Sequence, residues 1–430
     1  MKNAAPRRWA GAIAAACLLT ACNGAGTSMP QIGSSGSNGH SQSSPIQHVI
    51  VVVQENRTFN NLFATFPGTT GTTTGEERVG KGKSAQTKPI PLTEVHLYDK
   101  KNINHLYSAY WTAYRSGHMD AFNLIKYQAT GKPEGSAPYQ YVYQSDVQPY
   151  WTLAQTYAIA DQMFQTQGSG SFTAHQDLIR GGTEINSTQS LVDDPTSSGA
   201  WGCTSPPGTL TSLITTKLKV LRAQGPYPCT DKFPSSAGYE TLQVLLDKAG
   251  VSWKYYTPAA TKDTVGALWN AFLVIDSVYG DQSEWNAHIS TPETNIFTDI
   301  SSNALPAVSW VIPDGGNSDH PADGSDTGPS WVTSVVNAVG ASSYWNSTAI
   351  VVVWDDWGGF DDPVSPPKLD KQGGPGFRVG MLVISPYVPQ GEISHTVYEF
   401  GSILRYIEDN WNLGRLGTSD GTATSIANMF

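Results

Sequence analysis

Cysteine is scarce in this sequence, with four among 430 residues. Cys17 and Cys22 lie near the N-terminus, which leaves only Cys203 and Cys229 for the rest of the chain. This number and spacing exclude a zinc finger and offer no candidate for a catalytic cysteine. In an exported chain, two such cysteines most simply form one disulfide, and two free thiols are the alternative.

Charged residues are sparse as well. Asp, Glu, Lys and Arg make up 14% of the chain, and acids outnumber bases by 36 to 26. Three of the bases, Lys2, Arg7 and Arg8, lie at the N-terminus, so the remaining chain has 23 bases against 36 acids, a net charge of −13. A general nucleic-acid-binding protein needs a basic face that neutralises phosphates. The composition therefore excludes nucleic acid as an expected partner.

No apolar run beyond the N-terminus is long enough to cross a membrane. The run at about 9–19 follows a short basic region and is too short to span a bilayer comfortably, which is typical of a signal peptide. Its end, "LTAC" at 19–22, resembles the lipobox of bacterial lipoproteins, in which the cysteine is acylated. We predict a lipoprotein-type signal peptide at 1–22 that anchors the exported protein to a membrane through Cys22. The alternative is ordinary cleavage near Ala21 and a soluble periplasmic or secreted protein.

Residues 23–45 are rich in Gly and Ser and show no hydrophobic periodicity, so we expect a flexible linker there. The remaining residues, 46–430, are enough for one large domain with a sizeable core. Two long stretches in it, 65–89 and 183–235, are low in apolar content or irregular and read as surface loops.

Continuous apolar runs alternate with helical patterns along this domain. The runs predict strands buried on both faces, at 48–56, 305–314, 348–356 and 378–386. Between them lie amphipathic patterns that predict helices at 238–250, 330–340 and 400–411. The alternation predicts an α/β fold, a sandwich in which helices flank a mostly parallel central sheet.

Polar side chains follow three of the predicted strands where each strand ends. They are Glu55 and Asn56, then Asn317, Asp319 and His320, and finally Asp355 and Asp356. In such sheets ligands bind beyond the carboxyl ends of the strands, so we expect these groups to meet at one edge. Unpaired buried carboxylates are costly and repel one another, and a divalent cation would offset both effects. A carboxylate pair for glycoside hydrolysis and chance placement in polar loops are the alternatives.

A glycine-rich turn leads into a helical pattern at 165–182, and Ser171 lies at the turn. A hydroxyl at a helix N-terminus faces several free N–H donors, which favour an anionic group there. Taken alone, this segment is read more simply as an N-cap serine.

The order of the motifs resembles the bacterial phosphoesterase family that contains acid phosphatases and phosphatidylcholine-type phospholipases C. "VIVVVQENRTFNNLF" (49–63) resembles the opening motif of that family. Five further motifs follow in family order, at 116–122, 170–176, 305–321, 352–367 and 395–411. The resemblance covers about residues 46–412 and implies an alkaline-phosphatase-like sandwich with a single catalytic domain.

The resemblance assigns roles position by position. Ser171 matches the nucleophile that takes the phosphoryl group. The expected ligands of a divalent metal ion (Ca²⁺, Mg²⁺, Mn²⁺, Fe or Zn²⁺) are Glu55, Asn56, Asp355 and Asp356. The histidines that would contact the phosphoryl group or protonate the leaving group are His105, His320 and, as a weaker match, His288.

The chain departs from the family pattern at Asn60–Asn61 and at Asp361–Asp362, where the family usually has Asp-His. Whether that second aspartate pair belongs to the site stays open. The same holds for His175, one helical turn beyond Ser171, and for His395.

The function implied is that of an acid-phosphatase-like phosphomonoesterase. Phospholipase C acting on phosphatidylcholine-like lipids is the first alternative; such lipases often carry extra β domains, and the chain ends about twenty residues after its last predicted helix, which favours the phosphatase. The second alternative is a non-catalytic surface binding protein on the same fold.

Overall fold

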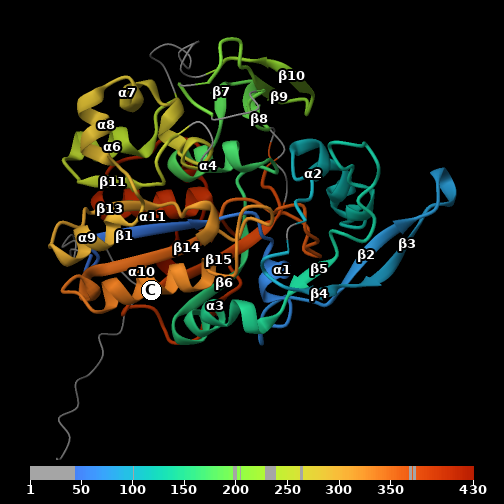
Figure 1. The fold of residues 1–430 in the computed structure, drawn as a ribbon, viewed down its shortest axis with the longest axis horizontal. Helices are drawn as coiled ribbons and strands as arrows, with labels where there is room; N and C mark the ends of the chain where they lie inside the picture. Colours follow the sequence, from blue (N-terminus) through green and yellow to red (C-terminus); the bar gives the residue numbers. More distant parts are fainter. Residues whose placement is uncertain are drawn as a thin grey trace, which may run out of the picture. The chain divides into compact units, whose positions relative to one another are not determined.

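The four predicted strands lie side by side at the centre of a nine-stranded sheet (Figure 1). The order across the sheet is β12 (Ile289–Ser290), β11 (Trp253–Tyr256), β13 (Val308–Val311), β1 (His48–Gln54), β14 (Thr348–Trp354), β15 (Arg378–Ile384), β6 (Ala158–Phe164) and β16 (Glu392–Ser394), with β17 (Tyr398–Glu399) also paired to β6. Every pairing is parallel except the two made by β15. Strands β6 and β11, which the sequence did not predict, extend the sheet on both sides.

The apolar runs are continuous because both faces of the central strands are covered. Val49 to Val53 of β1 are at most 1% exposed, and all seven residues of β14 are buried. A strand with one face in water would alternate polar and apolar side chains instead. The burial of both faces therefore explains the sequence pattern.

Helices cover the two faces. On one face α10 (Gly328–Gly340) contacts α3 (Gln144–Thr156) and α9 (Asn295–Ser301). On the other, α4 (Ser171–Arg180) contacts α6 (Leu242–Ala249) and α11 (Phe400–Trp411) (Figure 1). The three predicted helices are α6, α10 and α11, so the α/β sandwich with a mostly parallel central sheet is confirmed.

The two stretches expected to be irregular are in part ordered strands. An antiparallel hairpin, β2 (Thr74–Val79) and β3 (Gln86–Pro91), projects from the body (Figure 1). A four-stranded sheet is formed by β7 (Glu184–Asn186), β8 (Gln189–Val192), β9 (Thr211–Thr215) and β10 (Val220–Gly225). The polar residues within these short strands hid them, although Leu191 of β8 and Leu213 of β9 belong to the main hydrophobic core.

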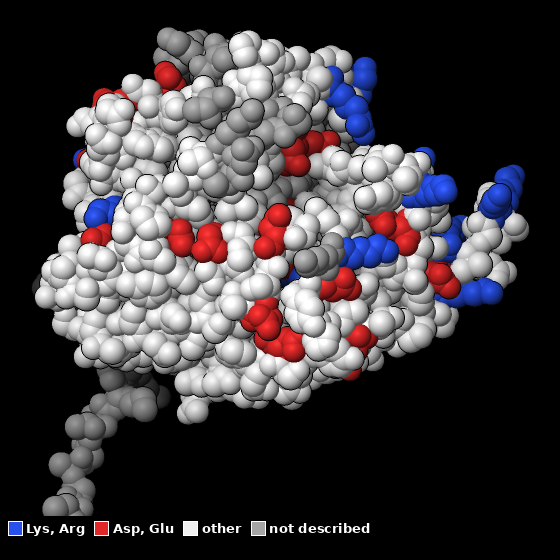
Figure 2. Space-filling model, viewed as in Figure 1, with Lys and Arg blue, Asp and Glu red and all other residues white. Residues whose placement is uncertain are grey.

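Smaller elements complete the described part of the chain. The short strands β4 (Thr93–Val95) and β5 (Gln140–Val142) pair with each other. The other α-helices among the described residues are α1 (Phe59–Phe63), α2 (Tyr107–Tyr114), α7 (Asp276–Tyr279) and α8 (Gln282–His288). On the face shown in Figure 2, Lys and Arg gather mainly over the β2–β3 hairpin and near β9 and β10, and Asp and Glu lie across the middle.

The computed structural model describes residues 44–430 apart from 100, 197–200, 204, 228–238, 262–264, 368–369 and 371–373. Ser44–Phe430 form one compact unit. The predicted signal peptide, nearly all of the predicted linker and Cys229 lie outside the described residues, so the lipid anchor and the disulfide stay predictions. Within the described part, no helix combines the length and the apolar character needed to cross a membrane.

Candidate active site at the carboxyl edge of the sheet

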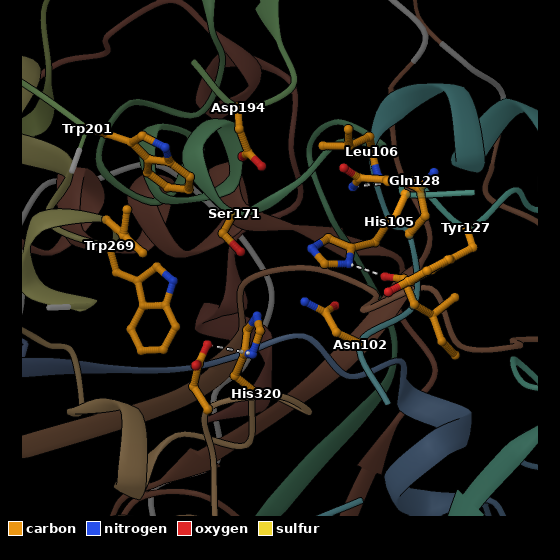
Figure 3. Close-up of a pocket in the computed structure, with 15 residues that line it drawn as sticks. Asn102, His105, Leu106, Tyr127, Gln128, Ser171, Asp194, Trp201, Trp269 and His320 are labelled. Atoms are coloured by element: carbon orange, nitrogen blue, oxygen red, sulfur yellow. Dashed lines mark hydrogen bonds and ion pairs between the residues drawn. The ribbon is translucent and has the colours of Figure 1, made fainter. Parts of the chain in front are cut away.

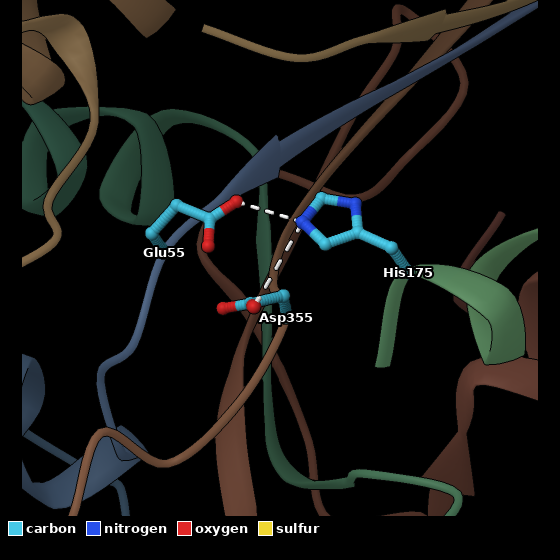
Figure 4. Close-up of side chains that lie close together, drawn as sticks. All are labelled: Glu55, His175 and Asp355. Carbon is cyan, nitrogen blue, oxygen red and sulfur yellow. Dashed lines mark hydrogen bonds and ion pairs between the residues drawn. The ribbon is translucent and has the colours of Figure 1, made fainter. Parts of the chain in front are cut away.

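Two adjacent parallel strands place Glu55 and Asp355 next to each other. Gln54, the last residue of β1, is paired with Trp354, the last residue of β14, so the residue that follows each strand leaves the sheet at the same point. Helix α4 adds His175, whose Nε2 lies 2.9 Å from Glu55 Oε1 and 3.9 Å from Asp355 Oδ2 (Figure 4). These three buried side chains form a group that could hold a metal ion.

The group lacks the hydrogen bonds that would satisfy it without a cation. Glu55 Oε2, Asp355 Oδ2 and His175 Nδ1 are buried and have no hydrogen-bond partner in the described part of the chain. Burial and the neighbouring Asp355 raise the pKa of Glu55 well above its usual range, and burial together with Asp356 raises the pKa of Asp355 to about 7. Burial lowers the pKa of His175 to about 3, so its imidazole is neutral and able to act as a ligand. A cation would offset this carboxylate repulsion, and the donor set therefore fits a divalent metal.

Asn56 makes the turn that connects this group to the nucleophile candidate. Its φ of 60° lies in the left-handed region, where asparagine is more frequent than most residues. Its backbone N–H donates to Asp355 Oδ1 at 2.8 Å, and its Nδ2 donates to His105 Nε2 at 3.0 Å. The amide thereby links the metal-binding group to one wall of the pocket described below.

Ser171 is the first residue of α4, and the N-cap position belongs to Gly170. The Ser171 hydroxyl donates to Asp356 Oδ2 at 3.0 Å and lies 3.4 Å from Asn56 Oδ1. Burial raises the pKa of Asp356 to about 8, and its other oxygen accepts a hydrogen bond from Gly358 N–H at 2.7 Å. The simple N-cap interpretation is therefore wrong: the hydroxyl faces a carboxylate rather than the free N–H groups of the helix.

Close backbone packing explains one glycine before Ser171. A Cβ on Gly168 would overlap the ring of Tyr110, so any larger residue would displace α2 from the turn. The glycine-rich sequence thus lets the loop that precedes α4 pass close to a neighbouring helix.

A pocket of about 420 Å³ opens in front of Ser171 (Figure 3). His105 and His320 flank the serine, with their ring centroids 6.5 Å apart. Trp201 and Trp269 contribute an aromatic wall. Acidic side chains also line the pocket, and no Lys or Arg is among the described residues that do so.

The two pocket histidines have different environments. His105 Nδ1 donates to the carbonyl of Ile103 at 2.7 Å, which leaves Nε2 as the atom that faces Asn56 and lies 3.8 Å from Asp356 Oδ2. His320 follows β13 and lies with Nδ1 3.1 Å from Asp323 Oδ2. Burial, and to a lesser extent His105, lowers the pKa of His320 to about 3.

The structure does not bring His288 to this site. Its Nδ1 donates to the carbonyl of Trp253 at 2.9 Å, and its ring stacks on the Trp253 ring with centroids 4.1 Å apart. Trp253 begins β11, so His288 lies by the amino end of a strand whose carboxyl end faces the site. The weak sequence match predicted a catalytic role for His288, but in the structure its ring packs against Trp253 and lies away from the site.

Other candidates also lie outside the pocket. Asp319 accepts hydrogen bonds from Tyr150 and Trp354 at 2.9 and 2.8 Å, so it supports the strand ends. In the second aspartate pair, Asp362 forms a buried ion pair with Arg378 at 3.1 Å. The half-exposed His395 pairs with Asp161 at 2.9 Å.

Asp194 is a pocket residue that the sequence analysis missed. It is partly buried, and desolvation raises its pKa to about 6. It follows β8 as the second residue of Asp193–Asp194, the same pattern of two aspartates after a strand that identified Asp355 and Asp356. The surrounding stretch, 183–235, looks irregular in sequence, so the aspartate pair was not recognised as following a strand.

Several bacterial phospholipases C are similar to this chain. The chain is similar to a non-hemolytic phospholipase C of Burkholderia pseudomallei, with 24% identity over 85% of this chain and 55% of that protein. It is similar to phospholipase C B of Mycobacterium tuberculosis, with 24% identity over 84% of this chain and 72% of that protein. A solved protein of the alkaline phosphatase superfamily from Vibrio parahaemolyticus aligns at a TM-score of 0.37 and 11% identity, covering 90% of this chain and 72% of that one.

The chain spans about half the length of the phospholipases of Burkholderia pseudomallei and Pseudomonas aeruginosa that it matches, 52–55%. The model of the Phosphoesterase family matches residues 46–414, nearly the whole described unit and every residue of the site above. The chain therefore belongs to the phosphoesterase family.

Proposed function

We propose that the chain is a metal-dependent hydrolase of phosphoric esters, most simply an acid-phosphatase-like phosphomonoesterase with Ser171 as nucleophile. The observation that carries the proposal is the position of the Ser171 hydroxyl. It lines the pocket at the start of α4 and donates to Asp356 beside the Glu55, His175 and Asp355 group.

The residues that would hold the metal are the four expected from the sequence, Glu55, Asn56, Asp355 and Asp356, together with His175. When bound, a divalent cation would offset the charge of the substrate phosphate and lower the pKa of the Ser171 hydroxyl. A donor set that includes an imidazole suits Mn²⁺, Fe or Zn²⁺ better than the all-oxygen sets typical of Ca²⁺ and Mg²⁺.

The side chains support a two-step reaction. In the first step a bond forms between Ser171 Oγ and phosphorus while the bond from phosphorus to the leaving oxygen breaks. Asp356 Oδ2 already accepts the hydroxyl hydrogen and is the acceptor for its proton. His105 and His320 flank the serine. The leaving oxygen takes its proton from the imidazolium form of His105, because the lowered pKa of His320 leaves that ring neutral. In the second step water attacks phosphorus and gives a proton to His105 while the bond from phosphorus to Ser171 Oγ breaks. The proton held by Asp356 returns to Ser171 Oγ, and phosphate leaves.

A phospholipase C is the second candidate, and the pocket lining favours it over other diesterases. Trp201 and Trp269 offer aromatic faces, and Asp194 and Asp323 supply negative charge without a lining Lys or Arg among the described residues. Aromatic faces and carboxylates attract a quaternary ammonium group such as that of choline. The relatives named phospholipase C are consistent with a phospholipid substrate.

The two candidates release different products. A phosphomonoesterase frees inorganic phosphate from p-nitrophenyl phosphate, whereas a phospholipase C frees phosphocholine from p-nitrophenyl phosphocholine. If the pocket binds a choline group, Trp269→Ala should slow hydrolysis of the choline ester more than hydrolysis of p-nitrophenyl phosphate. The matched control is Tyr387→Ala, at an exposed position outside the pocket. A metal-loaded protein that releases neither product would favour the third candidate, a surface binding protein.

We further infer that the protein is exported and held at the cell envelope by a lipid on Cys22, close to its phosphate-ester or phospholipid substrate. The support is the sequence of residues 1–22 and the Gly/Ser-rich linker that follows.

A further inference from the structure

A second, much smaller cavity lies beside the same helix that carries Ser171. Its volume is about 10 Å³, which is room for a single water-sized sphere. Asp177, six residues beyond Ser171 on α4, contributes one wall, and Gln167 of the loop before α4 contributes another. Ser190 of β8 closes the cavity from the four-stranded sheet. None of its lining residues belongs to the Glu55, His175 and Asp355 group.

Several oxygens at this cavity have no partner in the described part of the chain. They are both carboxyl oxygens of Asp177, Gln167 Oε1 and Ser190 Oγ. The three side chains are 1%, 6% and 1% exposed, respectively. Buried polar atoms are normally hydrogen-bonded because an unsatisfied one is costly, and here the unsatisfied atoms from three separate elements meet at one small space.

The charge around the cavity is negative. Glu184 and Asp370 line it together with Asp177, and Glu399 lies close enough to act on Asp177. Burial and the carboxylates of Glu184 and Glu399 raise the pKa of Asp177 well above its usual range. The nearby Arg180 is directed to Glu184, which it contacts at 3.0 Å, and to the carbonyl of Gly182 at 2.7 Å.

We propose that this cavity is a second cation site, suited to Ca²⁺. The bound ion would hold the loop before Ser171 against α4 and β8. A hard cation of this kind takes carboxylate, amide and hydroxyl oxygens, which are the donors present. The described residues that line the cavity include neither His nor Cys, so a softer metal is disfavoured. A water molecule would satisfy hydrogen bonds but would not offset the repulsion among the carboxylates.

The structural role of the bound cation follows from the positions of its proposed ligands in the chain. Gln167 lies between β6 and Ser171, and Asp177 lies about 9 Å farther along the axis of α4 than Ser171. A cation bound to both would hold the turn before the nucleophile against its own helix. Bound Ca²⁺ should therefore stabilise the fold without taking part in the reaction.

The test is Ca²⁺ binding in a protein whose first site is disabled. Chelator-treated Asp355→Asn protein is titrated with Ca²⁺ by calorimetry, and its melting temperature is measured with and without Ca²⁺. The proposal expects about one Ca²⁺ per chain with a Kd below ~1 mM and a rise in melting temperature. Adding Asp177→Asn should weaken binding at least tenfold and abolish the rise, whereas adding Glu94→Gln, an exposed carboxylate on β4, should change neither.

Two results would overturn the proposal. One is Asp355→Asn protein that binds no Ca²⁺ at millimolar concentration. The other is equal binding with and without Asp177→Asn, which would mean that Asp177 is a protonated buried acid and that any bound Ca²⁺ lies elsewhere. If the Asp177→Asn protein fails to fold, Gln167→Ala removes a different ligand, and Ca²⁺ affinity that is unchanged in that variant overturns the proposal equally.

Discussion

The Ser171 hydroxyl donates a hydrogen bond to Asp356 Oδ2 over 3.0 Å, joining the start of α4 to the loop that follows β14. Both side chains are at least 95% buried. A serine hydroxyl held against a buried carboxylate has a proton acceptor before substrate arrives, which is the arrangement an activated nucleophile needs.

Replacing Ser171 by Ala should reduce phosphate-ester hydrolysis by on the order of 10⁴-fold while the protein stays folded, because the attacking oxygen is lost. Product release and melting temperature are measured together. The control is Thr173→Ala on the same helix, which loses a hydrogen bond to the carbonyl of Gly170 and should lower stability by about 1 kcal/mol while turnover is retained. Near-parental turnover of the Ser171→Ala protein would end the nucleophile assignment.

Asp355→Asn should lower metal affinity at least tenfold, because one charged ligand beside Glu55 and His175 is removed. It should also raise the melting temperature of the metal-free protein, since the repulsion between Asp355 and Glu55 is relieved. Metal content after gel filtration and melting curves in chelator are the measurements.

A matched control exists in the second aspartate pair. Asp361 is also a fully buried carboxylate with both oxygens unpartnered among the described residues, yet it lies outside the metal-binding group. Asp361→Asn should leave metal content unchanged. A loss of metal equal to that of Asp355→Asn would mean that both aspartate pairs serve one centre.

Asp362→Ala should destabilise the protein by about 3–5 kcal/mol, because the buried Arg378 would lose its carboxylate partner. The same change should leave metal content intact. An exposed pair gives the comparison: Asp409→Ala removes the half-exposed partner of Arg415, which keeps its contact with Glu408, and should cost below about 1 kcal/mol. Denaturant unfolding of both variants measures the difference, and equal effects would contradict the assignment of Asp362 to a buried ion pair.

The raised pKa of Glu408, a residue far from the site, predicts that the stability of the fold depends on pH. Burial, and then the charge of Asp420, raises its pKa from 4.5 to about 8. The folded protein therefore keeps a proton that the unfolded chain releases, so this contribution to stability is complete below about pH 4.5 and is lost as the pH rises to about 8.

In the Glu408→Gln protein that contribution cannot titrate. The melting temperature of the parent should therefore fall relative to the variant between about pH 4.5 and about pH 8. Parallel curves across this window would show that Glu408 does not carry the raised pKa. Turnover of the variant, compared at one pH, should match the parent because α11 contributes no residue to the pocket.

Cys22→Ala should move the protein from the detergent phase to the aqueous phase in detergent partitioning, because the residue expected to carry the lipid is lost. Cys17→Ala, in the apolar run of the same signal peptide, is the control and should leave partitioning unchanged. A mature N-terminus at an unmodified residue other than Cys22 would contradict the lipid anchor.

The sequence by itself determined the layout of the fold and most of the site. Continuous apolar runs predicted β1, β13, β14 and β15, because a strand buried on both faces needs apolar side chains along its whole length. Because the carboxyl ends of parallel strands share one edge, Glu55 and Asp355 could be expected together from local patterns alone. The ordered motifs then singled out Ser171, the proposed nucleophile, which no local rule separates from an N-cap.

Tertiary structure decided which polar residues actually meet. The side chain of His175 joins Glu55 because α4 packs across the end of β1, and Asp194 reaches the pocket through a small sheet whose polar strands carry little hydrophobic signal. Asp319 and His320 are neighbours in sequence, yet one supports Trp354 and the other lines the pocket. Side-chain direction after a strand depends on turns and on long-range packing, and these are set by contacts between segments far apart in the chain rather than by the local pattern.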